Sequence, residues 1–318
     1  MRTLRIVFMG SPEFSVPSLA RLLEGPHRVV GVVTRPDRPR GRGRRLEPTP
    51  VKELALKVDL PVSTPERLRD KGFLSELKAL DADLFVVVAF RVLPEAVLQL
   101  PKGGVVNLHP SLLPKYRGPA PIQWAIINGE RETGATTLFI EPEVDTGDII
   151  LQERVPIGPD ETAGELHDRL KVLGADLLAH TVDLIAEGKA SRIPQPPGDW
   201  PRAPKLTKEH ARIRWEGPAE ALCNLIRGTN PIPGAFTAWR DRVLKVHRAR
   251  IVPEVEGKPG EVVQADGRAG MVVAAGEGGL YLTEVQLEGG RKMSSAEFVR
   301  GHRVEVGERL GEFEGSRT

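Results

Sequence analysis

From its N-terminus to a proline-rich stretch that begins near Ile193, this 318-residue chain alternates short β-branched runs with segments of helical periodicity. Three of the runs are almost continuous in Val and Ile, which is typical of strands buried on both faces of a parallel sheet. Strands that alternate with helices predict an α/β domain with a Rossmann-like, doubly wound and mostly parallel sheet. The expected strands are Arg5–Met9, Val29–Thr34, Leu84–Val88, Val105–Leu108 and Ala135–Ile140, and the expected helices are Val16–Leu23, Thr49–Val58, Glu66–Leu80, Ile122–Asn128 and Ala163–Glu187.

The composition changes after this domain. Residues 193–204 contain five prolines, which predict a stiff linker or strap between two domains. One helix and several short strands then follow, a pattern typical of a small β-barrel or sandwich, with an OB-like barrel as one option. We therefore predict a first domain over residues 1–191, a proline-rich linker over 192–207 and a smaller C-terminal β-barrel over 208–318. The expected elements here are the helix Pro218–Arg227 and the strands Arg242–Ile251, Gly260–Gln264, Gly270–Ala274 and Gly279–Gln286.

Composition excludes several classes of protein. Hydrophobic residues make up 40% and charged residues 28% of the chain, so it is neither disordered nor fibrous. The single cysteine, Cys223, excludes a disulfide framework and is predicted to be a packing residue, which fits a reducing compartment. The longest apolar run, 84–90, is far shorter than the about 20 residues of a membrane span. We expect a cytoplasmic protein with no membrane association.

Several catalytic motifs are missing. The loop Gly10–Phe14 follows the first expected strand, but it lacks the second and third glycines of a dinucleotide-binding fingerprint. The sequence also has no phosphate-binding GxxxxGK[ST] loop, no HExxH zinc motif and no GxSxG nucleophile motif. The sequence therefore gives no support for a nucleotide cofactor, a zinc protease or an α/β-hydrolase.

The most informative stretch lies at the end of the strand expected over residues 105–108. Asn107 and His109 are two residues apart, so their side chains leave the same face of the strand. They lie at its carboxyl end, where open α/β sheets bind their ligands. Ser111–Pro114 then forms a rigid apolar loop that can wall a flat ligand. Asp145, in an acidic turn further along the chain, is placed to orient the histidine and stabilise its charged form.

Each of these residues also has an ordinary structural interpretation. A single histidine on a strand is more often a structural residue than a catalytic one. Asp145 precedes Thr146 and Gly147, which is equally typical of a turn, and Leu112 and Leu113 are typical of a core. Spacing alone therefore leaves both interpretations open.

The same stretch resembles the signature of the folate-dependent formyltransferases. The resemblance extends to the first loop, to the arginine-rich run 35–46 and to the segments 205–215 and 226–234, so it covers nearly the whole chain. The residues that carry it are Asn107, His109, Ser111-Leu112-Leu113-Pro114, Tyr116-Arg117-Gly118, Pro121-Ile122 and Asp145-Thr146-Gly147.

This resemblance implies an enzyme of protein biosynthesis. The expected reaction transfers the formyl group of 10-formyltetrahydrofolate to the α-amino group of methionine on initiator tRNA, for translation initiation, and no metal ion is implied. Asn107 then becomes the expected amide donor to the oxyanion, His109 the proton carrier or a second donor, and Asp145 the partner of the imidazolium. The expected folate-binding residues are Ser111, Leu112, Leu113, Pro114, Phe90 and Arg91, the last two where the chain departs from the Ala-Tyr-Gly of the family.

Two basic segments are candidates for RNA binding. Residues 35–45 hold six arginines and one aspartate, interleaved with Pro and Gly, which predicts a mobile loop. A charge run of this kind is often a solvated surface, but the guanidinium fork suits phosphate, and the family resemblance makes this loop the element that grips tRNA. Residues 205–250 add ten Lys or Arg against four acidic residues, whereas Trp215 and Trp239 are expected to pack in a core. The expected tRNA-binding residues are Arg38, Arg40, Arg42, Arg44 and Arg45, with Arg42 as the key one.

Two other functions stay open at this point. A related formyltransferase acting on glycinamide ribonucleotide or an amino sugar would share Asn107, His109 and Asp145, but would need neither the arginine loop nor the basic C-terminal domain. A nonenzymatic RNA-binding protein on the same scaffold would have no need for all three polar residues. The expected enzyme acts as a monomer.

Overall fold

The computed structural model describes residues 2–40 and 45–311. The chain forms two compact units: unit 1 contains Met1–Pro121, Glu132–Pro156 and His167–Ala203, and unit 2 contains Ile122–Arg131, Ile157–Leu166 and Pro204–Thr318. The predicted first domain, residues 1–191, is continuous in the chain and therefore includes the two short segments Ile122–Arg131 and Ile157–Leu166. The contacts between residues place these segments in unit 2 instead.

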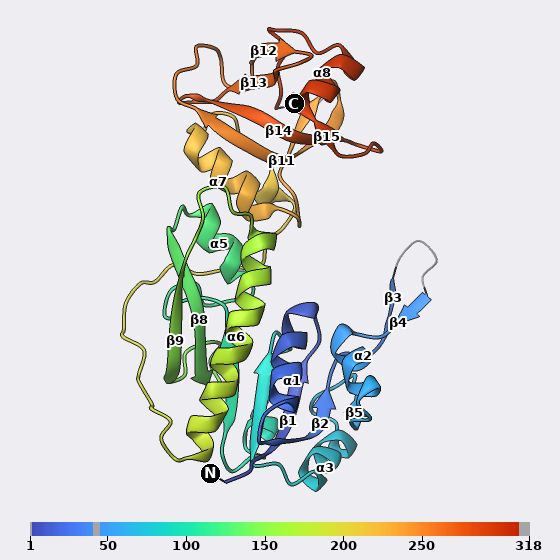
Figure 1. Cartoon of the computed structure of the whole chain (residues 1–318), viewed down its shortest axis with the longest axis vertical. Coiled ribbons are helices and arrows are strands. Elements are labelled where there is room, and N and C mark those ends of the chain that lie inside the picture. The colour runs from blue at the N-terminus through green and yellow to red at the C-terminus, as the bar shows by residue number, and fades with distance from the viewer. Residues whose placement is uncertain (1, 41–44, 312–318) are drawn as a thin grey trace. The chain divides into compact units, whose positions relative to one another are not determined.

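Unit 1 is built on a seven-stranded sheet with the strand order β5-β2-β1-β6-β7-β8-β9. The strands from β5 to β7 are parallel, and β8 and β9 run antiparallel at one edge. The predicted mostly parallel, doubly wound sheet is confirmed (Figure 1). The strands are β1 (Arg5–Gly10), β2 (Arg28–Val33), β5 (Val62–Ser63), β6 (Leu84–Val88), β7 (Val105–His109), β8 (Glu132–Phe139) and β9 (Ile149–Pro156).

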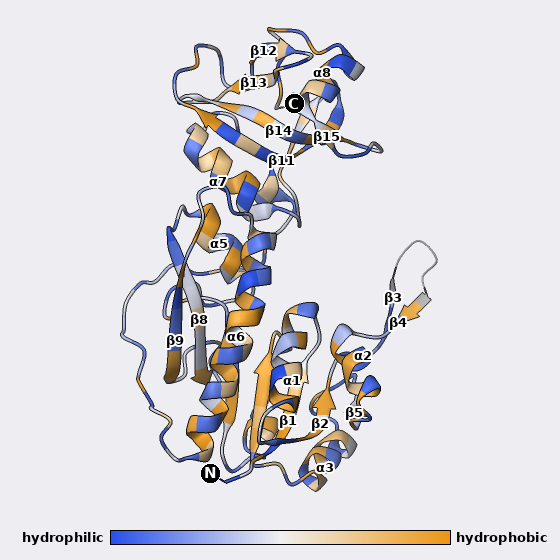
Figure 2. Ribbon diagram, in the orientation of Figure 1, coloured by the Kyte–Doolittle hydropathy of each residue, from blue (hydrophilic) through white to orange (hydrophobic). Residues whose placement is uncertain are grey.

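Helices cover both faces of this sheet, and its central strands are accordingly rich in hydrophobic residues (Figure 2). On one face, Val7 of β1 belongs to a buried cluster with Phe73 of α3. On the other face α6 packs so closely on β7 that a Cβ at Gly174 would lie 2.8 Å from the Leu108 side chain. The helices of unit 1 are the 3-10 helix η1 (Glu13–Ser15), α1 (Val16–Leu23), α2 (Pro50–Lys57), α3 (Lys71–Ala79), α4 (Glu95–Leu98) and α6 (Ala163–Ala186), whose first four residues belong to unit 2.

Local capping signals set where two of these helices begin. The side chain of Asp70 accepts a hydrogen bond from the Phe73 amide at 3.1 Å, so α3 starts at Lys71 and not at the expected Glu66. A capping box precedes α6, since Thr162 and Glu165 each accept a hydrogen bond from the other's backbone amide.

The arginine-rich run differs from the expected loop. Its two ends form an antiparallel ribbon in which β3 (Arg38–Arg40) pairs with β4 (Arg45–Glu47). Pro39 lies opposite Leu46, and proline is tolerated here because a two-stranded ribbon consists of edge strands. The loop prediction is therefore wrong for these two stretches.

Unit 2 contains a separate antiparallel sheet with the path β10-β11-β14-β13-β12, and β15 pairs with β14. The antiparallel C-terminal domain is confirmed, while its closure into a barrel stays a prediction. Trp215 and Trp239 lie in its core, as expected, and their ring nitrogens donate to Thr237 and Glu308. Its elements are α5 (Pro121–Ile127, from residue 122), η2 (Glu209–Ala211), α7 (Ala219–Thr229), β10 (Phe236–Trp239), β11 (Arg242–Val252), β12 (Val262–Asp266), β13 (Gly270–Ala274), β14 (Gly279–Leu287), β15 (Met293–Ser294) and α8 (Ser295–His302).

None of the helices in the described part of the chain combines the length and the apolar composition that a membrane span requires.

Candidate active site

The strand β7 carries Asn107 and His109 at its carboxyl end. Asn107 lies between Val87 of β6 and Leu138 of β8, so the pair belongs to a strand in the interior of the sheet. The two side chains leave the same face, because residues two apart on a strand point the same way. The structure thus places both residues at the sheet end where ligands of α/β proteins bind.

His109 is held by contacts to both of its ring nitrogens. The residue is only 4% exposed. Its Nε2 lies 2.9 Å from the Tyr116 carbonyl oxygen, and because a carbonyl only accepts, Nε2 carries the hydrogen and donates it. Its Nδ1 lies 3.6 Å from the Asp145 carboxylate. Nδ1 therefore faces the carboxylate across a gap slightly longer than a hydrogen bond.

The Asp145 carboxylate is fixed by a backbone donor. The Gly118 amide donates to its Oδ2 at 3.0 Å, and this oxygen is the one that faces His109. Asp145 itself has a φ of 57°, in the left-handed region that aspartate adopts more readily than most residues. Asp145 therefore forms part of a tight turn and also directs its carboxylate at His109. The structural and the functional interpretation of this residue are compatible.

The Asn107 side chain is the polar group of this site that the protein leaves available. Asn107 is half-buried, and its amide makes no hydrogen bond within residues 2–40 and 45–311. Since both nitrogens of His109 already face protein atoms, the Asn107 amide is the donor that a bound ligand could reach without a rearrangement.

Gln195, in the proline-rich stretch, joins the two loops that hold His109. Its side-chain Nε2 donates to the carbonyl oxygens of Asp145 and Gly147, both at 2.9 Å. Its Oε1 accepts from Arg117 through Nε at 3.0 Å and Nη2 at 2.6 Å. One amide thus connects the turn that carries Asp145 with the loop whose Gly118 amide and Tyr116 carbonyl contact the site.

The backbone around Gln195 reinforces this connection. The Tyr116 amide donates to the Pro201 carbonyl at 2.6 Å, and the Ala203 amide donates to the Arg117 carbonyl at 2.9 Å. Residues 193–203 are therefore part of the wall of the site, in addition to leading toward the second domain. Sequence reasoning missed Gln195, because proline content suggests a strap but does not show what the strap contacts.

The predicted folate-binding loop divides into two pairs of residues. Ser111 and Leu113 are buried: the Ser111 hydroxyl donates to the Lys115 carbonyl at 2.7 Å, and Leu113 packs in a small apolar cluster. Leu112 and Pro114 are half-exposed. Ser111 and Leu113 thus stabilise the conformation of the loop, whereas Leu112 and Pro114 lie at its surface.

The other two predicted folate-binding residues lie after β6. Phe90 packs against the apolar cluster of α3, and the Arg91 guanidinium lies 5.2 Å from the centre of its ring. Arg91 donates to the carbonyl oxygens of Pro65 and Glu66 at 2.8 and 3.0 Å. Burial, and then the nearby charge of Arg35, lowers the pKa of Arg91 from its usual value. Both residues stay candidates for folate contacts.

Of the predicted tRNA-binding residues, Arg38 is exposed at the start of the β3–β4 ribbon, and Arg40 and Arg45 pair through their backbones at its far end. Arg42 and Arg44 lie outside the described residues. Asp37, the one acid of this run, accepts an ion pair from Lys52 at 2.7 Å. The negative charge of Asp37 is therefore neutralised by Lys52, which is not one of the arginines of this run.

Comparison with known proteins identifies the family. The sequence model of the family described as "Formyl transferase" matches residues 4–182, and that of "Formyl transferase, C-terminal domain" matches residues 205–303. The chain belongs to the formyl transferase family. Both halves of this formyl transferase, including the sheet of unit 2, are thus accounted for by one family.

Curated relatives match this formyl transferase over almost its whole length. The methionyl-tRNA formyltransferase of Pelotomaculum thermopropionicum is 50% identical over 97% of this chain and 99% of its own. That of Moorella thermoacetica is 49% identical, with the same coverage. Among solved structures, the N-formyltransferase of Helicobacter canadensis in complex with folinic acid and dTDP-3-aminofucose has a TM-score of 0.66 at 19% identity, covering 92% of this chain and 100% of its own. At that identity the similarity supports the fold alone.

In the part of this formyl transferase that the structure describes, no group of three or more His, Cys, Asp or Glu side chains is arranged to hold a metal ion.

Proposed function

We propose that this formyl transferase is a methionyl-tRNA formyltransferase, which transfers the formyl group of 10-formyltetrahydrofolate to the α-amino group of methionine on initiator tRNA. The observation that carries this proposal is about 50% identity, over almost the entire length of both chains, to proteins with that name. The same identity extends through the C-terminal domain of these methionyl-tRNA formyltransferases, which favours their substrate over glycinamide ribonucleotide or an amino sugar.

The reaction forms a bond between the amine nitrogen and the formyl carbon and breaks the bond between that carbon and the folate nitrogen. The folate supplies the formyl carbon and takes up one proton, while the amine loses one. The protein must therefore stabilise a developing oxyanion, move a proton and hold two ligands in line.

Asn107 supplies the donor to the oxyanion in this proposal. Its amide is half-exposed, it stays uncharged at every physiological pH, and no protein group within the described residues engages it. A preorganised amide of this kind strengthens its hydrogen bond as negative charge develops on the formyl oxygen. This available amide at the carboxyl end of β7 is the feature that best fits a formyl donor.

His109 and Asp145 move and stabilise the proton. Nε2 of His109 carries the hydrogen that it donates to the Tyr116 carbonyl, so in the neutral ring Nδ1 is the nitrogen whose lone pair can accept a proton. Asp145, at 3.6 Å from Nδ1, favours the charged ring. The pair can thus accept the proton that the amine loses and return it toward the folate nitrogen.

The arginines of the β3–β4 ribbon and of the residues between its strands, Arg38, Arg40, Arg42, Arg44 and Arg45, contact the phosphates of tRNA in this proposal. Their charge and the compensation of Asp37 by Lys52 support it. Action as a monomer and a cytoplasmic location stay predictions.

A formyl-transfer assay separates the candidate functions. With 10-formyltetrahydrofolate as donor, we expect turnover with methionyl initiator tRNA and none with uncharged tRNA, glycinamide ribonucleotide or an amino sugar nucleotide. Turnover with one of the last two alone would assign the chain to a related enzyme. Binding of tRNA without formylation of any acceptor would leave only the RNA-binding protein.

Gln195→Ala should lower turnover about ten- to a hundredfold. The variant removes the hydrogen bonds to the Asp145 and Gly147 carbonyls and to Arg117, and a misplacement of about 1 Å in a catalytic group can cost about a hundredfold. Steady-state kinetics should show the loss mainly in kcat, since Gln195 contacts protein loops.

The variant Gln195→Glu tests this positioning role further. It keeps an acceptor for Arg117 but loses the donor to Asp145 and Gly147, so kcat should fall nearly as far as in Gln195→Ala. The control is Gln99→Ala, because Gln99 is bonded to Glu95 in the exposed α4 region of the same unit. Equal kcat in Gln195→Ala and the control would show that the strap does not position the site.

A further inference from the structure

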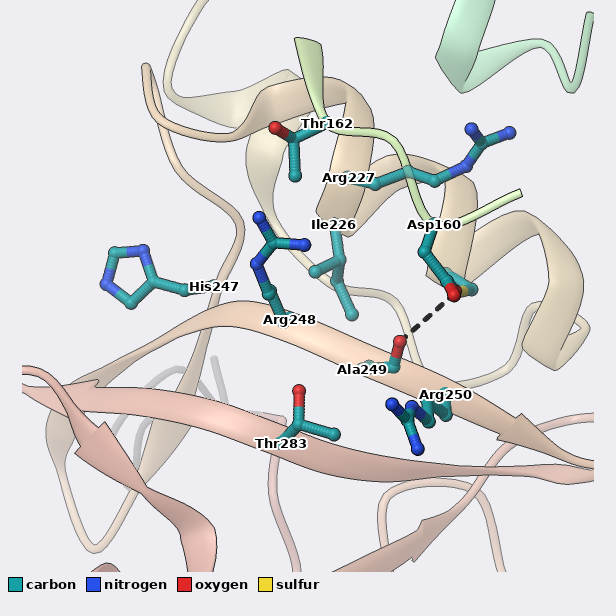
Figure 3. A pocket seen from close by; sticks show the side chains of 10 residues that line it. Asp160, Thr162, Ile226, Arg227, His247, Arg248, Ala249, Arg250 and Thr283 are labelled. Carbon is teal, nitrogen blue, oxygen red and sulfur yellow. Dashed lines mark hydrogen bonds between the residues drawn. The ribbon is translucent and has the colours of Figure 1, made fainter. Parts of the chain in front are cut away.

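A cavity of about 180 Å³ lies in unit 2 between α7, β11 and the loop that precedes α6. Its three arginines lie in the basic segment 205–250, and the cavity belongs to a different unit from the catalytic residues. Figure 3 shows its lining side chains, which come from four separate stretches of the chain. They are Asp160, Thr162, Cys223, Ile226, Arg227, His247, Arg248, Ala249, Arg250 and Thr283.

Hydrogen bonds from two α7 side chains hold the walls of this cavity, which we call the α7–β11 pocket. The Cys223 thiol donates to the Ala249 carbonyl at 3.6 Å and joins α7 to β11. Arg227 holds the loop before α6 through the carbonyl oxygens of Gly158 and Glu161, at 3.2 and 3.4 Å. Burial raises the pKa of the Cys223 thiol, so this cysteine has a packing role, as expected.

An irregularity in β11 aims two arginines at the pocket. The register with β14 shifts on both sides of Arg248, and such a bulge redirects the side chains of its strand. As a result Arg248 and Arg250 both line the pocket, together with Thr283 of β14. Figure 3 labels all three side chains among those that line the pocket.

The lining carries a surplus of positive charge. Three guanidinium groups line the pocket against one carboxylate, that of Asp160. The Arg248 side chain already pairs with Glu165, but the Arg250 side chain has no ion pair or hydrogen bond within the described residues. His247 adds no charge, because burial lowers the pKa of its ring and its Nε2 bonds Gln286. Arg250 is therefore the cation available to a ligand.

The size of the pocket limits the ligand. A volume of about 180 Å³ is far more than one water needs and less than the several hundred Å³ typical of drug-sized ligands. A small anionic group fits both the volume and the charge. The planar fork of arginine bonds two phosphate oxygens at once, and a neighbouring hydroxyl can donate to another.

We propose that the α7–β11 pocket binds one phosphodiester group of the RNA substrate, with Arg250 and Thr283 as its ligands and Arg248 as the adjacent cation. This inference rests on the proposed function, which supplies the RNA. It adds a defined anchoring point in unit 2, formed by β11, β14 and α7, to the arginine ribbon of unit 1.

The test compares Arg250→Gln with Arg268→Gln in the full-length protein. Arg268 is an equally exposed arginine of unit 2 that does not line the pocket. At about 0.1 M salt, Arg250→Gln should weaken methionyl-tRNA binding about three- to tenfold and reduce the slope of log K against log salt by about 0.7–0.9, as expected for one lost phosphate contact. The Arg268→Gln variant should bind as the parent does, and folate affinity should stay unchanged in both.

A second pair of measurements identifies the source of the phosphate. Thr283→Val keeps the β-branched shape and removes the hydroxyl, so it should also weaken tRNA binding. Inorganic phosphate, exchanged for chloride at constant ionic strength, should compete with tRNA in the parent and lose this effect in Arg250→Gln. Phosphate competition in the parent combined with unchanged tRNA affinity in Arg250→Gln would assign the pocket to a free anion and overturn the proposal.

The two proposals fail in distinguishable ways. Equal tRNA affinities of Arg250→Gln, Arg268→Gln and the parent would refute the pocket, even if the parent formylates methionyl-tRNA normally. A parent that binds tRNA through Arg250 but formylates no acceptor would refute the catalytic proposal alone.

Discussion

His109→Ala and Asn107→Ala should each lower the turnover of formyl transfer by at least about 10²- to 10³-fold. Removal of one oxyanion donor or one general acid–base group costs about this much in other enzymes. In His109→Ala the Asp145 carboxylate also loses the ring nitrogen that it faces at 3.6 Å. Single-turnover kinetics with saturating folate and methionyl-tRNA would measure the chemical step in each variant.

A matched histidine controls for the loss of a buried ring. His27 is also buried in unit 1, and its Nε2 lies 3.1 Å from the Asp183 carboxylate, so it makes the same kind of pair away from β7. His27→Ala should lower the free energy of unfolding and leave turnover per folded molecule close to that of the parent. The catalytic assignment fails if both Asn107→Ala and His109→Ala keep turnover within tenfold of the parent.

Gly147→Ala should have the second large effect, although it changes no polar group. A Cβ at Gly147 would lie 1.8 Å from the Phe139 carbonyl oxygen, which no real contact allows. The obstacle is backbone at the end of β8, where the Phe139 amide bonds the Asp148 carbonyl at 3.0 Å. The turn must therefore move, and both the Gln195 bond to the Gly147 carbonyl and the position of Asp145 change with it.

The expected result is a loss of turnover of about 10²-fold, since small displacements of a catalytic group have effects of this size. The free energy of unfolding should fall by about 1–3 kcal/mol from overpacking. Kinetics and urea denaturation on the same preparation measure both. The control is Gly25→Ala in the same unit, where the nearest atom to a new Cβ is at 3.5 Å. Parent-like turnover in Gly147→Ala would show that the geometry of this turn does not matter for catalysis.

Much of the fold could be predicted because its signals lie within single segments. The hydrophobic run Leu84–Val88 has the bounds of β6, and the segment Val16–Leu23 those of α1. The structure differs where a partner strand decides the outcome. β9 and the β3–β4 ribbon contain charged residues that give no strand pattern, and they form because a neighbouring strand supplies their hydrogen bonds (Figure 1).

The candidate site shows the same division. Asn107 and His109 could be predicted from their position at the end of a strand. Because side chains alternate between the two faces of a strand, residues two apart share one face. Gln195 gives no such signal, because its importance lies in four hydrogen bonds to segments about 50 and 78 residues away in the chain. The burial of Ser111 and Leu113 likewise depends on how the loop folds onto β8, and not on residue type.

The sequence by itself determined the layered α/β domain, the C-terminal strands and the residues at the end of β7, since periodicity and motif order are properties of contiguous residues. Only the tertiary structure decided that Asp145 faces Nδ1 of His109, that the proline-rich strap supports this pair and that Arg248 and Arg250 share a pocket with α7. The physical reason is that these contacts join residues far apart in the chain, and packing and loop geometry, which no local pattern encodes, bring them within bonding distance.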